Sequence, residues 1–79
     1  MTIHNLTDAR IVVTYEVEVN DRVVAQSAIE LDPEQRNYVP PGLFRAGRCL
    51  PGALVARSGG EVVARLPQPC REQVWEVTE

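Results

Sequence analysis

The chain contains no lysine, and all eight of its basic residues are arginine. The absence of lysine excludes Schiff-base chemistry and a phosphate-binding P-loop, because both depend on a lysine amine. Eight basic residues against eleven acidic ones give a formal charge of −3. An acidic chain is poorly suited to the nucleic-acid backbone, so we expect no nucleic-acid partner.

Histidine and cysteine are also scarce, with one histidine, His4, and two cysteines in the whole chain. A zinc site needs four ligands, usually cysteine and histidine, and there is no Cys-x-x-Cys pair. His4 lies near an end that we expect to fray, away from a nucleophile such as Cys49 or Cys70. We therefore expect no catalytic residue, no metal and no cofactor, and a protein that is not an enzyme.

No apolar run approaches the length needed to cross a membrane, so we expect no membrane partner. Residues 1–7 have neither the basic start nor the apolar stretch of a signal peptide. The localisation is therefore open: we expect a cytoplasmic protein unless the chain is the processed form of a secreted one. Asn5-Leu6-Thr7 matches the glycosylation acceptor pattern, and a turn leading into the first strand explains the same triplet equally well.

The 79 residues are enough for one domain. We predict a single β domain over residues 1–79, in which residues 1–9 form a loosely ordered N-terminus. A domain of this size buries little more than half of its unfolded surface, and its stability is small. One disulfide that closes a loop of about 22 residues would then contribute about 3 kcal/mol.

The two cysteines are placed symmetrically about a turn signal. The midpoint between Cys49 and Cys70 falls between Gly59 and Gly60, and Gly-Gly closes two-residue β-hairpins. Such a hairpin brings the two cysteines opposite each other. The expected pairs outward from the turn are Ser58 with Glu61, Arg57 with Val62, Val55 with Ala64 and Ala53 with Leu66.

Prolines limit the length of this hairpin. Pro51 and Pro67 cannot donate a hydrogen bond to a ladder, so regular pairing is expected to end near Gly52. The two arms then splay apart, and a disulfide between Cys49 and Cys70 would clamp them. We predict this structural disulfide; the alternative is a cytosolic protein that keeps both thiols reduced.

Residues 10–19 are the clearest strand, because apolar residues alternate there with polar ones. Glu16 and Glu18 share the opposite face, which we expect to be solvated. A turn at Asn20-Asp21 leads to a second strand at residues 23–31. The apolar row of the first strand consists of Ile11, Val13, Tyr15, Val17 and Val19.

The loop between these strands decides their register. A loop of three residues, 20–22, keeps both apolar rows on one face, and a loop of five residues preserves the same phase. A loop of two residues does not, so we predict the three-residue loop, with Arg22 in a left-handed conformation. The expected pairs are Val19 with Val23, Val17 with Ala25, Tyr15 with Ser27, Val13 with Ile29 and Ile11 with Leu31.

The remaining segments are short. We expect an edge segment at residues 38–39, a hairpin of residues 53–57 with 61–66, and a last strand at residues 73–78. We predict an all-β fold, a small antiparallel sandwich or partly open barrel of five to six strands built from two hairpins. A meander with one covered face is the simpler alternative.

The segment of residues 38–51 is the best candidate for a binding site. It combines aromatic, apolar and arginine side chains in an expected loop anchored at Cys49. Tyrosine and arginine are enriched among interface hot spots, and loops on rigid scaffolds often carry function. We predict the binding residues Tyr38, Phe44, Arg45 and Arg48; alternatively, Phe44 packs into the core.

These features favour a small, soluble, non-enzymatic module that binds another protein as an inhibitor, adaptor or assembly subunit. A specific version presents Arg45 or Arg48 to a trypsin-like proteinase, and unpaired edge strands offer a route to a homodimer. One alternative is a protein regulated through the thiols or disulfide of its two cysteines. Another is a small-ligand or carbohydrate-binding domain centred on Trp75 and Tyr38.

Overall fold

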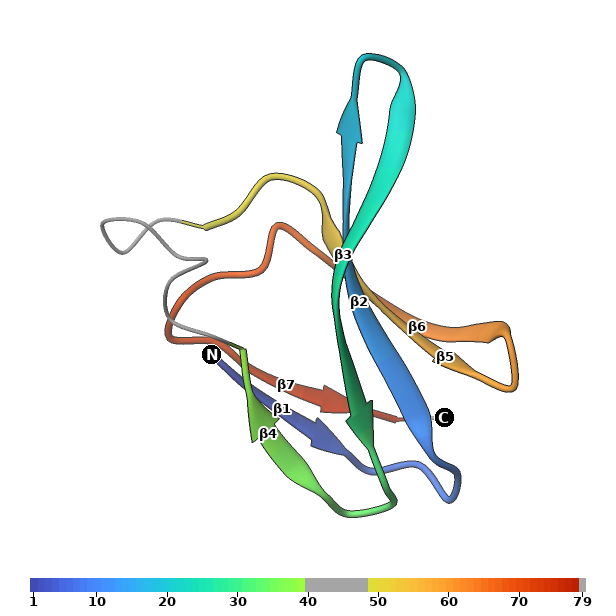
Figure 1. Cartoon of the computed structure of the whole chain (residues 1–79). Helices are drawn as coiled ribbons and strands as arrows, with labels where there is room; N and C mark the ends of the chain where they lie inside the picture. Colours follow the sequence, from blue (N-terminus) through green and yellow to red (C-terminus); the bar gives the residue numbers. More distant parts are fainter. Residues whose placement is uncertain (40–48, 79) are drawn as a thin grey trace.

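The computed structural model describes residues 1–39 and 49–78. These residues form seven strands and no helix, and the strands assemble into two sheets (Figure 1). The all-β prediction is therefore confirmed, although five to six strands were expected. The strands are β1 (Thr2–Asn5), β2 (Ile11–Val19), β3 (Arg22–Leu31), β4 (Arg36–Tyr38), β5 (Ala53–Ser58), β6 (Glu61–Pro67) and β7 (Val74–Val77).

The two sheets form a small sandwich rather than a closed barrel. The first sheet has the strand order β4-β1-β7, and the second has the order β3-β2-β5-β6. Strand pairing is antiparallel everywhere except between β1 and β7, which are parallel. Apolar side chains from both sheets meet in one core between them, and its buried members are Ile3, Ile11, Val13, Tyr15, Leu31, Val39, Leu54, Ala56 and Val77.

Thr2–Asn5 form strand β1, whereas a loosely ordered segment was expected at residues 1–9. Strand β1 is the central strand of the first sheet, and its Ile3 and Asn5 are fully buried. Strand β1 has four residues, three of them polar, and this alternation is too short to be identified from the sequence. Its strand partners lie more than 30 residues away, so no local turn signal marks it.

A hydrogen-bonded turn follows β1 and explains the Asn5-Leu6-Thr7 triplet. The Asn5 side-chain Oδ1 accepts from the Thr7 N–H at 2.9 Å, as in an Asx turn. The Asn5 Nδ2 donates to the carbonyls of Ala9 and Leu31 at 2.8 and 3.0 Å. The amide is therefore occupied inside the fold, and the triplet serves as the turn, not as an exposed glycosylation acceptor.

The β2–β3 hairpin has a two-residue turn, so the predicted three-residue loop is wrong. Asn20 and Asp21 have φ of 51° and 62°, and Val19 pairs with Arg22 across them. Both turn residues adopt the left-handed conformation that a type I′ turn requires and that asparagine and aspartate tolerate. The three predicted pairs nearest the turn are consequently replaced by Glu18 with Val23, Val17 with Val24 and Tyr15 with Gln26.

A β-bulge restores the predicted register at the base of the same hairpin. The register shifts between Thr14 and Tyr15, leaving Ser27 as the extra residue, with φ of 54°. Beyond the bulge, the two predicted pairs at the base of the hairpin, Val13 with Ile29 and Ile11 with Leu31, are confirmed. Turn chemistry sets the register at the tip, burial sets it at the base, and the bulge reconciles the two.

The β5–β6 hairpin turns at Gly59-Gly60, as predicted, with φ of 57° and 85°. The pairs Ser58 with Glu61 and Arg57 with Val62 are confirmed, but the register then shifts by one. The predicted pairs of Val55 with Ala64 and Ala53 with Leu66 are therefore wrong. A bulge at Val63 is the reason, because it brings the core-packing residues Ala64 and Leu66 opposite Ala56 and Leu54.

The two cysteines are joined. Cys49 and Cys70 form a disulfide with their Cα atoms 4.0 Å apart, so the predicted bond is present in the structure. Neither cysteine belongs to a strand, and the bond links the chain before β5 to the chain after β6. It thus fastens the splayed ends of the hairpin, as the positions of the prolines indicated.

Reducing this bond should lower stability. Replacing both cysteines by serine (Cys49→Ser with Cys70→Ser) should reduce the free energy of unfolding by about 3 kcal/mol, because the unfolded chain loses its cross-link. Denaturant titration with and without a reductant measures the change. Reductant should bring the wild-type chain to the value of the double variant and leave that variant unaffected; equal wild-type stability in both conditions would contradict the prediction.

Gly52 should not tolerate a side chain. It has φ of +87°, and a Cβ there would overlap the Glu16 carbonyl oxygen on β2. We expect Gly52→Ala to lower the free energy of unfolding by about 2 kcal/mol or more. Gly59→Asn is the matched control, because Gly59 has φ of +57° but open space around it. The two variants should differ clearly in denaturant midpoint; similar midpoints would refute the steric argument.

Candidate functional site

Tyr38 is the one predicted binding residue that the structure describes, and it is highly exposed. It lies on the edge strand β4 with 72% of its surface accessible. Tyr38 pairs with Thr2 of β1, and Thr2 pairs on its other side with Val74 of β7. Because Ile3 is buried and side chains alternate along a strand, Thr2 and its two partners face away from the core.

A second row runs beside the first. His4 of β1 pairs with Arg36 of β4 and with Glu76 of β7, and it follows the same outward alternation as Thr2. The two rows together form one solvent-facing surface of mixed chemistry, with an aromatic ring, a valine that is 63% exposed and charges of both signs. We call this the Tyr38 surface, and its residues are Thr2, His4, Arg36, Tyr38, Val74 and Glu76.

The other predicted binding residues, Phe44, Arg45 and Arg48, lie outside the described residues. The chain on either side of residues 40–48 is well attached to the scaffold. Before the segment, the buried Val39 donates its N–H to the carbonyl of Met1 at 3.0 Å. After it, Cys49 is bonded to Cys70. The first attachment is to the residue that precedes β1, and the second is to the connection that leads into β7.

The connection after residue 49 is held by two further contacts. Leu50 donates its N–H to the Pro69 carbonyl at 2.8 Å. The hydroxyl of Tyr15, a core residue of β2, donates to the Pro51 carbonyl, and burial raises the pKa of that hydroxyl. These two hydrogen bonds connect the chain between Cys49 and β5 to the disulfide region and to the core.

Trp75 contributes to the core more than to a binding surface. It lies on β7 opposite the fully buried Ile3, is half-buried, and packs against the core cluster. Much of the indole ring therefore has a structural contact already. A sugar-stacking platform that combines Trp75 with Tyr38 is not formed, because the two side chains face opposite sides of the first sheet.

The outer face of the second sheet carries a polar network that the sequence did not reveal. Arg57 of β5 donates to the Glu16 carboxylate at 2.5 Å, and the Thr14 hydroxyl donates to the same oxygen at 3.0 Å. Val55 pairs with Thr14 on this face and is 2% exposed, although it faces away from the core between the sheets. Glu16 was expected to be solvated, but in the structure it forms a salt bridge with Arg57.

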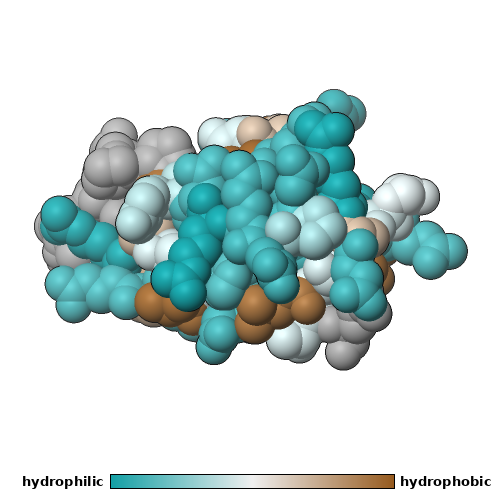
Figure 2. Space-filling view, turned by 90° about the horizontal axis from the view of Figure 1, so that it is seen from below, coloured by the Kyte–Doolittle hydropathy of each residue, from teal (hydrophilic) through white to brown (hydrophobic). Residues whose placement is uncertain are grey.

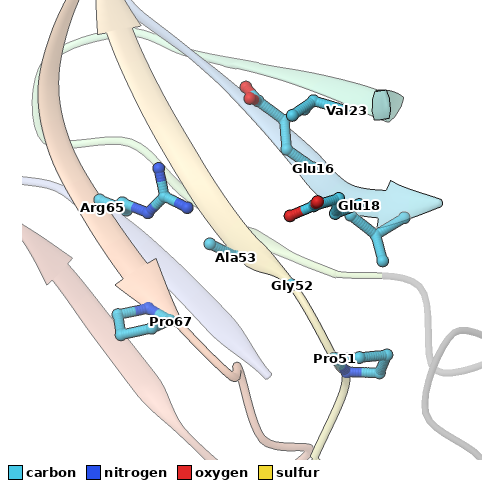
Figure 3. Close-up of a pocket in the computed structure, with 9 residues that line it drawn as sticks. Glu16, Glu18, Val23, Pro51, Gly52, Ala53, Arg65 and Pro67 are labelled. Carbon is cyan, nitrogen blue, oxygen red and sulfur yellow. The ribbon is translucent and has the colours of Figure 1, made fainter. Parts of the chain in front are cut away.

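A cleft of about 340 Å³ lies beside this network. Ala53 lines the bottom of the cleft with a small side chain, and the longer side chains of Glu18 and Arg65 line it from the neighbouring strands β2 and β6. Figure 3 shows the Glu18 and Arg65 side chains on opposite sides of Ala53. In the described part of the chain, neither group forms a salt bridge. The lining contains no serine, cysteine or histidine, so it has none of the usual nucleophile–base pairs.

Other surfaces are less informative. Figure 2 shows that the face seen from below is mainly hydrophilic, with hydrophobic side chains gathered in a short band at one edge. Among residues 1–39 and 49–78, no three histidine, cysteine, aspartate or glutamate side chains converge to hold a metal ion. The same residues include no helix long and apolar enough to cross a membrane.

The Glu16–Arg57 pair should make stability depend on pH. The hydrogen bond from Arg57 lowers the pKa of Glu16 below its usual value of 4.5, with smaller contributions from Thr14 and Arg65. A lowered folded-state pKa means that the stabilisation is complete above the unfolded-state pKa. It is lost as the pH falls through the lowered value.

We therefore expect wild type to exceed Glu16→Gln in free energy of unfolding near neutral pH, with the difference shrinking in acid. Denaturant titrations across this pH range measure the difference. Glu18→Gln is the matched control, because Glu18 lies on the same strand and forms no salt bridge with a described residue. A difference for Glu16→Gln that stays constant with pH would contradict the proposed role of the pair.

No protein-family model, curated protein or solved structure matches this chain.

Proposed function

We propose that this protein is a non-enzymatic module that binds another protein through the Tyr38 surface. The observation that carries the proposal is the 72% exposure of Tyr38 on a strand that is paired and attached at its end. An isolated exposed tyrosine on a mobile end would mean little. Here the β1–β4 pairs and the Val39–Met1 hydrogen bond fix the backbone that carries the ring.

The chemistry of the surface supports binding to a protein. Tyrosine and arginine are enriched at interface hot spots, and a tyrosine loses little conformational entropy when it is immobilised. Tyr38 and Val74 provide apolar contact area, while Arg36 and Glu76 provide charges on the same face. Specific protein interfaces combine apolar contact area with polar and charged groups in this way.

The neighbouring segment extends the proposal beyond the described residues. Phe44, Arg45 and Arg48 follow Tyr38 closely in the sequence, and their contribution stays a prediction from composition. The inhibitor version, in which Arg45 or Arg48 enters a trypsin-like active site, is a finer form of the same proposal. Regulation through the Cys49–Cys70 disulfide also stays a prediction.

Photo-crosslinking in the native host tests the proposal. We expect a photoreactive phenylalanine analogue at position 38 to form an adduct with a discrete host protein. The same analogue at position 62 is the matched control, because Val62 is 57% exposed but lies on β6 of the other sheet. Tyr38→Ala should then weaken binding of the captured protein about tenfold or more, as expected for a hot-spot residue.

Two results would count against the Tyr38 surface. One is the same set of adducts from positions 38 and 62. The other is equal affinity of wild type, Tyr38→Ala and Val62→Ala for the captured protein, measured by titration calorimetry. Circular dichroism of both variants ensures that the comparison is made between folded proteins.

A further inference from the structure

The β2–β3 hairpin extends beyond the rest of the second sheet. Strand β5 pairs with β2 only from Val12 to Glu16, so the remainder of the hairpin has no third strand among the residues that the structure describes. We call this part, residues 17–26, the β2–β3 arm. Figure 1 shows the arm projecting from one end of the sandwich. A two-stranded ribbon without further support is only marginally stable in water.

The arm carries exposed valines on both of its faces. Val23 is 68% exposed, and Val19 and Val24 are also exposed. Val23 lies on the face that carries Glu18, whereas Val24 pairs with Val17 on the opposite face. Among the described residues, nothing fully covers either face of the tip, and association with a second copy would bury further apolar surface.

The outer edge of β3 has no strand partner among residues 1–39 and 49–78. Val19 and Arg22 flank a two-residue turn, so they exchange hydrogen bonds, as does every second pair along the ladder. The intervening β3 residues, Val23 and Ala25, therefore direct their N–H and C=O groups away from β2. In the described part of the chain, β3 is the last strand of its sheet on this side, so these groups can pair with another strand.

Two irregularities limit the edge that can pair. The turn ends at Asp21, and the bulge residue Ser27 has a left-handed φ of 54°. The regular edge between them is the five-residue segment of residues 22–26. Its midpoint is Val24. A two-fold axis that uses the whole segment must therefore pass beside Val24.

We propose that two copies of this chain associate through antiparallel pairing of their β3 edges about a two-fold axis at Val24. The paired edges form one continuous eight-stranded sheet from the two second sheets. In this register Val24 faces Val24 of the second copy, and the backbone groups of Val23 and Ala25 are satisfied across the axis. The expected pairs are Val24 with Val24, Val23 with Ala25 and Arg22 with Gln26.

Charge supports a second copy in this register. Arg22 is the single charged residue of residues 22–26, and it meets the uncharged Gln26 of the second copy. A shift of the register toward the turn moves the two Arg22 side chains toward each other, which is unfavourable. A shift the other way requires pairing at Ser27, where the bulge breaks the ladder. The edge is thus self-complementary in one register.

The expected dimer is weak. Five residues from each copy bury less surface than a stable interface, which needs roughly 800 Å² per partner. We expect dissociation constants on the order of 100 µM, about 5.5 kcal/mol of binding free energy. The arm and the Tyr38 surface belong to different sheets, so this proposal and the proposed function can fail independently.

Cysteine crosslinking tests the register directly. The two Val24 residues form a non-hydrogen-bonded pair, with Cα atoms about 4.5 Å apart, which is within reach of a disulfide. Val24→Cys should therefore yield a covalent dimer on mild oxidation at least tenfold faster than Val62→Cys. Position 62 is the matched control, because Val62 is 57% exposed on the opposite edge strand, β6. Equal crosslinking rates would overturn the proposal.

Sedimentation equilibrium of the unmodified chain provides the second measurement. The average mass should rise from 8.8 kDa toward twice that value as the concentration increases to the millimolar range. Val24→Lys should keep the protein monomeric by placing two lysines at the axis, whereas Val62→Lys should dimerise like wild type. A wild-type mass of 8.8 kDa at every concentration, or loss of the dimer in Val62→Lys alone, would overturn the β3 interface.

Discussion

Strand β1 is the constraint on which the rest of the structure depends. The first sheet contains no hairpin, and its three strands come from the beginning, middle and end of the described chain. Strands β4 and β7 are not paired with each other, and in this sheet each is hydrogen-bonded only to β1. The fully buried Ile3 adds an apolar anchor, and the Asn5 side chain ties the end of β1 to the end of β3.

Strand β1 also holds the residues of the Tyr38 surface in place. Tyr38 projects from a strand of three residues, which would not be stable alone. Its position is defined because β1 pairs with β4 on one side and with β7 on the other. The disulfide complements this arrangement, since it joins the chain after residues 40–48 to the connection before β7. The second sheet, by contrast, is built from two local hairpins and presents its free edges on β3 and β6.

Local sequence signals predicted the parts of the fold that depend on local chemistry. The Gly59-Gly60 turn, the disulfide and strand β2 followed from turn preferences, spacing and alternation. The pairing registers did not, because bulges at Ser27 and Val63 each insert one residue without a glycine or proline to announce it. Strand β1 was missed because its partners are distant, and a single sequence does not contain a signal for such pairing.

The candidate site was predictable to a similar extent. Tyr38 belongs to a short edge strand, as expected, but its alignment with Val74 depends on the parallel β1–β7 pairing. The partnership of Glu16 with Arg57 had one usable signal, since both lie on strands expected in the sheet, but only the observed β2–β5 register brings them together.

Amide hydrogen exchange measured by NMR tests the central role of β1 most directly. The amides of Asn5, Leu6 and Val39, each hydrogen-bonded across the first sheet, should exchange as slowly as that of Val13 in β2. Exchange of these amides at the rate of an unstructured peptide, while Val13 remains protected, would contradict the account.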